Sequence, residues 1–204
     1  MPVDCTGHLT ADIAFDCLNA PVGGIEQNVV LINKDDIDVT ATTVSADNRL
    51  QVTHIQLKTG KTGYKLEGVK QSNGKAWELV KKENAPDKFK HTFSGVIFNP
   101  SLTNKIQADS LAKGGKYVVV VEQLWKGAGN KDAFEVLGFT AGLELTTMTN
   151  SSKENDNMIM FELASADGFE ETTMPKTYYF ADEDDQPTGY AERKTLFTNK
   201  FVEA

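Results

Sequence analysis

The chain has 204 residues, 21 Lys and Arg against 29 Asp and Glu, a net charge of -8 and 40% hydrophobic residues. This length is enough to bury one substantial core, and the composition is close to that of ordinary globular proteins and unlike that of disordered chains. The acidic balance argues against proteins that bind nucleic acid by neutralising phosphates with clustered Lys and Arg, so we expect no sequence-specific nucleic-acid binding.

Residues 1–24 are expected to form an N-terminal arm, followed by a single β-rich domain over residues 25–204. The arm contains Asp4, Asp12 and Asp16, where a secretory signal would be basic or apolar. No later window approaches the roughly 18 consecutive apolar residues that a membrane helix needs. We therefore expect a protein that folds in a cytoplasm and does not contact a membrane.

Alternation of β-branched and aromatic residues with other residues recurs from residue 27 onward and predicts about ten short strands separated by Gly, Asn and Ser turns. In chain order, the predicted strands are 27–32, 52–57, 64–70, 89–98, 117–125, 133–139, 143–148, 158–163, 176–180 and 191–201. Parallel sheets would need helical crossovers between most of these strands, so the predicted fold class is mainly β, an antiparallel β-sandwich or barrel. Segment 76–82 fits a strand and a helical turn equally well.

One flanking α-helix is predicted near residues 100–113. Asn99 suits the N-cap, Pro100 the first helical position, and Gly114 follows the end of the pattern. Its apolar side chains recur at helical spacing, which predicts that one face packs against a sheet. The side chains expected on that face are Leu102, Ile106 and Leu111.

Two connections are poor in apolar residues, namely 34–48 and 150–157. Polar connections of this kind usually lie at the protein surface. We expect them to order against a neighbouring subunit if the protein assembles, and to stay mobile if it is a monomer.

Catalytic motifs are lacking. The three histidines lie in separate segments, and no GxSxG elbow or phosphate-binding glycine loop is present. His54 and His91 fall within predicted strands, which favours structural roles for both rings. We therefore expect a protein that is not an enzyme. A hydrolase with an unrecognised acidic pair is a weaker alternative, because the distance between two carboxylates depends on the fold.

Metal-binding patterns are equally weak. Cys5, Cys17 and His8 lack paired ligand spacing, which favours two reduced thiols over a metal site. The acidic run at 182–185 lacks the alternating ligands of a calcium loop and is expected to be a solvated turn between two strands, with a weak divalent-ion site as the alternative. We expect no metal and no cofactor.

The negative charge is concentrated in the second half of the chain. Residues 1–102 hold 11 basic and 12 acidic residues, a net of -1, whereas residues 103–204 hold 10 and 17, a net of -7. If these acids share one surface, that surface would repel DNA. The alternative is that they only keep the protein soluble.

Three stretches carry a family resemblance. They are GGIEQNVVLINKDDI at 23–37, FEVLGFTAGLELTTMT at 134–149 and NMIMFELASADGFEE at 157–171. In their order along the chain, together with the polar arm, they resemble bacteriophage tail tube proteins and related β-rich virion structural proteins. Head-completion and decoration proteins are members of the wider group with which the same features agree.

The resemblance implies a β-sandwich or barrel with a flanking helix, hexameric rings stacked into a tube, and contacts with other virion proteins. Such a tube belongs to the virion, is assembled in the host cytoplasm and commonly has an acidic lumen for DNA. No catalytic residues are implied. On this interpretation, the arm at 1–24 and the loop at 34–48 make inter-subunit contacts, and acids of 103–204 line the lumen.

The alternative from a different class is a monomeric ligand- or carbohydrate-binding β-domain. It would need exposed aromatic side chains gathered in one patch. The candidates are Trp77, Trp125, Tyr178, Tyr179 and Tyr190. Because three of these fall in predicted strands, we expect most of them to pack in the core or on a sheet face.

Overall fold

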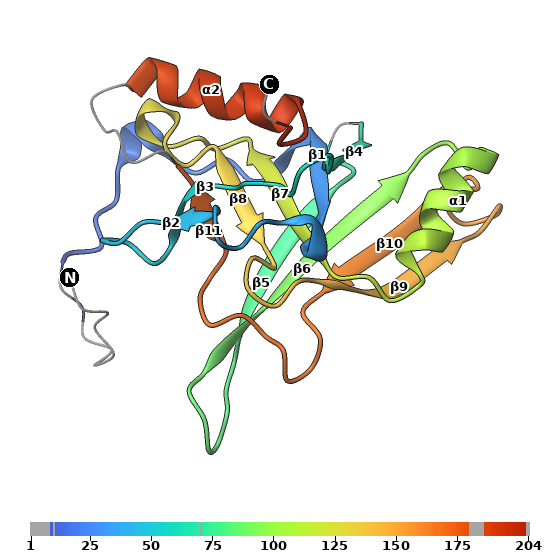
Figure 1. The fold of residues 1–204 in the computed structure, drawn as a ribbon, viewed down its shortest axis with the longest axis horizontal. Coiled ribbons are helices and arrows are strands. Elements are labelled where there is room, and N and C mark those ends of the chain that lie inside the picture. The colour runs from blue at the N-terminus through green and yellow to red at the C-terminus, as the bar shows by residue number, and fades with distance from the viewer. Residues whose placement is uncertain (1–8, 10, 70, 180–185, 203–204) are drawn as a thin grey trace.

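The computed structural model describes residues 9, 11–69, 71–179 and 186–202, and its fold combines two β-sheets with two α-helices (Figure 1). The strands are β1 Ile25–Asn33, β2 Thr43–Val44, β3 Gln51–His54, β4 Tyr64–Glu67, β5 Gly74–Val80, β6 Lys88–Ile97, β7 Tyr117–Gln123, β8 Phe134–Leu137, β9 Glu144–Asn150, β10 Ile159–Ala164 and β11 Lys176–Tyr178. The α-helices are α1 Leu102–Leu111 and α2 Gln186–Thr198, and the short 3-10 helices are η1 Cys17–Asn19, η2 Lys34–Asp36 and η3 Ala128–Asn130. The prediction of a mainly β fold with a flanking helix is confirmed, and segment 76–82 lies mostly in strand β5.

The larger sheet has seven strands in the order β2-β3-β11-β8-β7-β1-β4. Its central part includes the run of valines in β7, which pairs with β1 on one edge and with β8 on the other. The valines are buried on both faces of the sheet, because a further layer covers each face. The expectation of an antiparallel fold holds for every strand pair except one. β11 runs parallel to β3, with Thr177 opposite Gln51 and Tyr178 opposite Val52.

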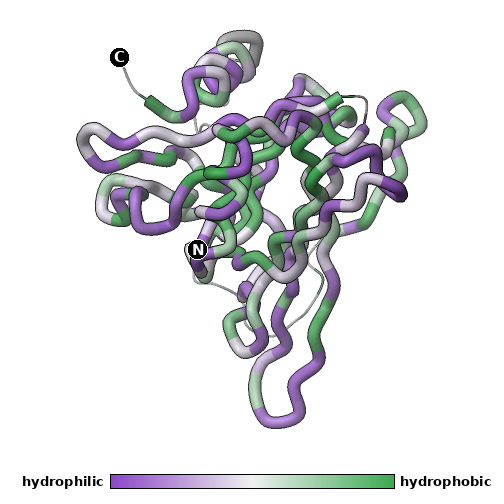
Figure 2. The backbone as a smooth tube through the Cα atoms, turned by 90° about the vertical axis from the view of Figure 1, so that its right-hand side faces the viewer, coloured by the Kyte–Doolittle hydropathy of each residue, from purple (hydrophilic) through white to green (hydrophobic). Residues whose placement is uncertain are grey.

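The smaller sheet has four antiparallel strands in the order β5-β6-β10-β9. The β5–β6 hairpin projects away from the body, with a hydrophilic turn at the tip (Figures 1 and 2). Among the described residues, the outer edges of β5 and β9 pair with no other strand.

The two sheets and α2 form three layers with a core on each side of the seven-stranded sheet. One core lies between that sheet and α2 and includes Val120, Phe134 and Phe197. The other lies between the two sheets and includes Leu31, Phe93 and Phe161. This arrangement is a sheet-on-sheet packing with an added helical layer, and it is not a closed barrel.

The predicted helix near 100–113 is present, but its first turn and its packing differ from the prediction. Ser101 caps the helix, with Oγ accepting a hydrogen bond from Asn104 N at 3.3 Å, so the helix begins two residues after the predicted start. Leu102 and Ile106 are exposed, and only Ala108 is buried. Leu111 packs against the core between the sheets. The helix therefore contacts the body only through its C-terminal half.

The predicted strand at 191–201 is wrong, because this segment lies mostly in helix α2. Buried Arg193 and Phe197 are spaced four residues apart on the helix face that covers the larger sheet, and Phe201, just after the helix, packs into the same core. Aromatic rings from α2 contact Phe134 of β8, at 5.2 Å from the Phe197 ring and 5.9 Å from the Tyr190 ring. No described helix has the length and apolar character needed to cross a membrane.

Candidate assembly surfaces

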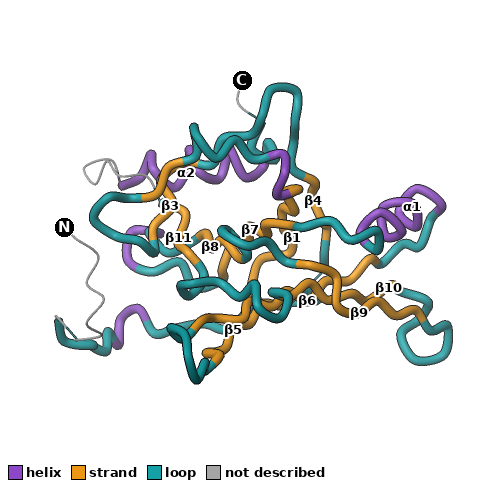
Figure 3. The backbone as a smooth tube through the Cα atoms, turned by 60° about the horizontal axis from the view of Figure 1, so that its bottom comes forward, coloured by secondary structure: helices purple, strands orange, loops and turns teal. Residues whose placement is uncertain are grey.

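The N-terminal arm leaves the body at β1 and runs out past its edge (Figure 3). Five of its large apolar side chains among the described residues are exposed. The exposed fraction is 87% for Ile13, 79% for Phe15 and 91% for Leu18, and Leu9 and Val22 are also exposed. Transferring such side chains to an apolar environment is favourable by about 1.5–3 kcal/mol each. The arm therefore presents apolar surface that its own chain does not cover.

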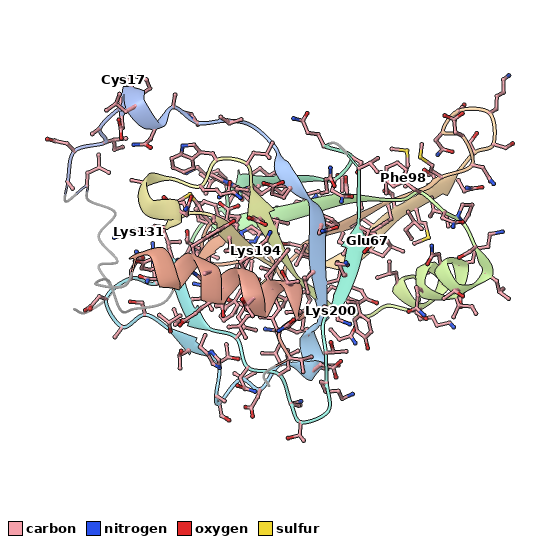
Figure 4. All side chains as sticks on the ribbon, turned by 90° about the horizontal axis from the view of Figure 1, so that it is seen from above. Cys17, Glu67, Phe98, Lys131, Lys194 and Lys200 are labelled. Atoms are coloured by element: carbon pink, nitrogen blue, oxygen red, sulfur yellow. The ribbon has the colours of Figure 1, made fainter. Side chains whose placement is uncertain are left out.

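One hydrogen bond from the body holds the arm at its middle. Trp125 Nε1, after β7, donates to Asn19 O at 2.9 Å. Just before it, Asp16 caps η1 by accepting from Leu18 N at 2.9 Å, and hydrogen bonds from Asn19 and Leu18 lower the pKa of Asp16. The exposed thiol of Cys17 lies in this turn, away from the sheets (Figure 4).

The β5–β6 hairpin carries a second uncovered apolar surface. Trp77 and Leu79 are 46% and 47% exposed, and they alternate along β5 on the side that faces the larger sheet, because their cross-strand partners are His91 and Phe89. The hairpin extends past the larger sheet here, so both side chains stay largely open to solvent. The Trp77 ring makes an edge contact with the Phe89 ring at 5.8 Å.

Glu170 contacts the turn end of the hairpin, where β5 leads into β6. Its carboxylate accepts from Lys82 Nζ at 2.7 Å and lies 3.9 Å from Lys88 Nζ, and these lysines belong to the two sides of the hairpin. The hydrogen bond from Lys82 lowers the pKa of Glu170 to about 2. Next to it, Phe89 and Glu171 exchange two backbone hydrogen bonds. The segment that carries Glu170 and Glu171 thus holds the hairpin close to its turn.

Both polar connections carry hydrogen bonds within the chain. In the loop at 34–48, Asp38 Oδ1 accepts from the backbone of Thr40 and Ala41, and Thr42 Oγ1 bonds the backbone of Gln56. The connection at 150–157 forms the β9–β10 turn, where the side chains of Asn150, Ser151 and Asn155 bond the local backbone. Contacts of these loops with a neighbouring subunit stay a prediction.

Three acidic residues of the second half, Glu122, Glu170 and Glu171, are buried and add no charge to an outer surface. Glu122 of β7 accepts hydrogen bonds from Lys126 at 2.7 Å, from Tyr190 Oη at 2.6 Å and from Lys194 of α2. Burial acts to raise the pKa of Glu122, but these hydrogen bonds outweigh it and lower the pKa. Part of the predicted lumen charge is thus a structural cluster under α2.

Glu171 and His91 hold the turn that carries the chain from β8 in the larger sheet to β9 in the smaller one. Glu171 Oε1 accepts from Thr140 N at 2.9 Å and from Ala141 N at 2.8 Å. The His91 ring accepts from Gly138 N at Nδ1, at 3.2 Å, and lies 3.0 Å from Thr173 O through Nε2. Because a carbonyl only accepts, Nε2 carries the proton and the ring is neutral. The structural role expected of His91 is confirmed.

The five candidate aromatic residues do not gather in one patch. Tyr178 is fully buried in the core under α2, whereas Trp77 lies on the hairpin of the other sheet. Trp125 holds the arm, the Tyr190 ring stacks on Phe134, and Arg193 lies over the Tyr179 ring at 4.4 Å. Two surface hollows of about 380 and 340 Å³ lie at α2 and at β1. Neither is lined by an aromatic residue among those described.

The remaining candidate residues lie apart from one another or outside the described part of the chain. His54 bonds the side chain of Gln56 at 3.0 Å on the larger sheet, far along the chain from His91. Cys5, His8 and the run at 182–185 lie outside the described residues. Among the residues that are described, no group of three His, Cys, Asp or Glu side chains is placed to hold a metal ion.

The apolar surfaces of the arm and the hairpin were not predicted from the sequence, although both leave a signal there. Ile13 and Phe15 alternate with Asp12, Ala14 and Asp16, as in a strand with one apolar side. Trp77 and Leu79 alternate in the same way. Comparison with known proteins found no matching family model, no curated protein and no solved structure.

Proposed function

We propose that this chain is a virion structural protein, most simply a tail tube subunit that assembles with copies of itself into rings forming a conduit for DNA. The observation that carries the proposal is the N-terminal arm, whose Ile13, Phe15 and Leu18 are almost completely exposed. A monomer gains nothing from ordering such side chains in water, whereas a neighbouring subunit would bury them. The proposal assigns the chain no catalytic role.

Two further features support self-assembly. The four-stranded sheet leaves both of its outer strands, β5 and β9, with an open edge among the described residues. Open strand edges favour pairing with another chain. The β5–β6 hairpin, which Glu170 contacts near its turn, projects away from the body, as a contact between rings would require.

The proposal is tested by light scattering during size-exclusion chromatography and by negative-stain microscopy of the purified chain over a wide range of concentrations. We expect rings or short tubes at high concentration. Deleting residues 1–24 should abolish them while the remaining chain keeps a cooperative unfolding transition. A full chain that stays monomeric at every concentration would contradict the proposal, and a glycan array would then test the monomeric carbohydrate-binding alternative.

A further inference from the structure

The structure leaves two apolar strips uncovered. One is formed by Ile13 and Phe15 on the arm, and the other by Trp77 and Leu79 on β5. We propose that residues 12–16 of one copy add as a strand to the open edge of β5 in a second copy. This inference rests on the self-assembly proposed above, and it names the two segments that meet.

The arm segment is suited to strand addition. Residues 12–16 have no helix or turn, and Asp16 has the extended dihedral angles φ -101° and ψ 104°. Ile13 and Phe15 are two residues apart, so in a strand both point to the same side, while Ala14 points to the other. A strand formed here has one apolar side, which matches a half-buried position in a sheet.

The β5 edge offers the complementary surface. Its Trp77 and Leu79 are also two residues apart, both on the uncovered side of the hairpin, with Glu78 on the opposite side. Alignment of the two strips brings Ile13 and Phe15 beside Trp77 and Leu79. Aromatic and β-branched neighbours on adjacent strands stabilise a sheet, and the backbone groups of the open edge gain partners.

Net charge favours the encounter of the arm with the hairpin. Residues 9–24 carry two acidic residues and no basic ones. The hairpin over residues 74–90 carries five basic residues, Lys75, Lys81, Lys82, Lys88 and Lys90, against three acidic ones, Glu78, Glu83 and Asp87. The net charge of -2 on the arm and +2 on the hairpin favours their encounter at long range. In the aligned strands, Asp12 and Asp16 lie on the same side as Glu78, so the pairing itself depends on the apolar side chains and the backbone.

Alignment of the strips places Ala14 opposite Glu78 whether the added strand runs parallel or antiparallel to β5. This pair therefore allows a cross-linking test that does not depend on strand direction. Opposed residues on neighbouring strands have Cα atoms about 4.5–5.5 Å apart, which a disulfide can span.

The experiment uses two full-length chains of different mass in which Cys5 and Cys17 are replaced by serine. One carries Ala14→Cys and the other Glu78→Cys. We expect a disulfide-linked heterodimer when the two are mixed, assembled and oxidised with oxidised glutathione. Pairing the Ala14→Cys chain with a Leu102→Cys chain, whose thiol lies on exposed α1, is the matched control and should give at least about tenfold less product.

The outcomes separate the inference from the proposed function. Assemblies that form without the 14–78 heterodimer would overturn the inference and leave the function standing. A chain carrying both cysteines that cross-links only within itself would overturn it as well. Failure of the full chain to assemble at all would contradict the proposed function, and with it the inference that rests on it.

A second variant tests the energetics without cysteines. Replacing Ile13 and Phe15 together by Asp should raise the concentration needed for assembly at least about tenfold, because both apolar contacts are lost. Leu102→Asp, which changes an exposed apolar residue outside both strips, should leave that concentration unchanged. Equal effects of the two variants would contradict strand addition.

Discussion

His91 is held in one protonation state by the two backbone groups that its ring contacts. A proton added at Nδ1 would face the N–H of Gly138, so that two donors meet and a hydrogen bond is lost. Burial lowers the pKa of His91, the carboxylate of Glu171 raises it in part, and the ammonium of Lys176 lowers it again. The folded protein therefore takes up this proton less readily than the unfolded chain.

The sign of the pH dependence follows from this lowered pKa. Below the unfolded-state pKa of about 6.5, the unfolded chain binds the proton first, so the contribution of His91 to stability is present above that pH and is lost as the pH falls. We expect the free energy of unfolding to fall by up to about 1.4 kcal/mol per pH unit below pH 6.5 from this group. Urea titrations at several pH values measure it.

The control for this effect is His91→Asn, whose Oδ1 can still accept from Gly138 but cannot be protonated in this range. The variant should be less stable at pH 8 and should show a shallower slope between pH 6.5 and 5. An unchanged slope would mean that other groups cause the acid sensitivity, and that His91 has no part in it.

At the scale of elements, α2 is joined to the larger sheet by two kinds of contact. Its aromatic rings pack on Phe134, and its Lys194 pairs with the carboxylate of Glu122. Removing that charge leaves Lys126 and Lys194 without their main partner next to the core. Breaking a buried ion pair typically costs about 3–5 kcal/mol. Because Lys194 is 44% exposed and can turn towards water, we expect about 2–3 kcal/mol for Glu122→Gln.

This change should first release α2. Hydrogen exchange should show faster exchange of the α2 amides than of the β7 amides in the variant. A suitable comparison is Glu144→Gln, which removes a half-exposed partner of Lys116 and should cost less than about 1 kcal/mol. Equal losses from the two variants would contradict a special role for the buried carboxylate.

The elements also show where sequence patterns sufficed and where they failed. The run of valines in β7 and the alternation in β6 predicted strands correctly, because burial and pleating favour the same residue types. The segment that forms α2 misled the prediction, since its aromatic residues have high strand propensity. The spacing of four residues between Arg193 and Phe197 is the feature of this segment that agrees with a helix.

At the scale of the whole molecule, the two sheets approach closely where β6 lies against β4. Gly95 makes this approach possible. A Cβ atom at this position would lie 2.5 Å from the Phe161 ring and 3.0 Å from Leu66. We expect Gly95→Ala to destabilise the protein by about 1–3 kcal/mol, because the added methyl group would overlap the buried Phe161 ring and force it to shift.

Thermal unfolding measures this cost, and Gly74→Ala is the matched control. Gly74 lies on β5, and a Cβ atom added there would meet no other atom within 4 Å, so its replacement should leave the melting temperature nearly unchanged. If both variants melt alike, close packing at Gly95 does not set the distance between the sheets.

The long-range arrangement could not be predicted from local patterns. The parallel pairing of β11 with β3 joins residues more than 120 positions apart, and nothing in either short strand specifies the other. The burial of Glu122, Glu171 and Arg193 was equally hidden, because charged side chains are expected at the surface until their partners are known. For the candidate surfaces, the sequence indicated the arm at 1–24 but not the strip on β5.

Glu170 and Glu171 are adjacent in the chain, but their carboxylates bind two different parts of the molecule. Glu170 pairs with Lys82 and Lys88 on the two sides of the hairpin. Glu171 accepts backbone hydrogen bonds from Thr140 and Ala141 in the turn between the two sheets. The turn end of the hairpin is therefore connected to the turn between the two sheets through one peptide unit, in addition to the connection through β6. We therefore expect a displacement of the hairpin turn to shift the connection between the two sheets as well.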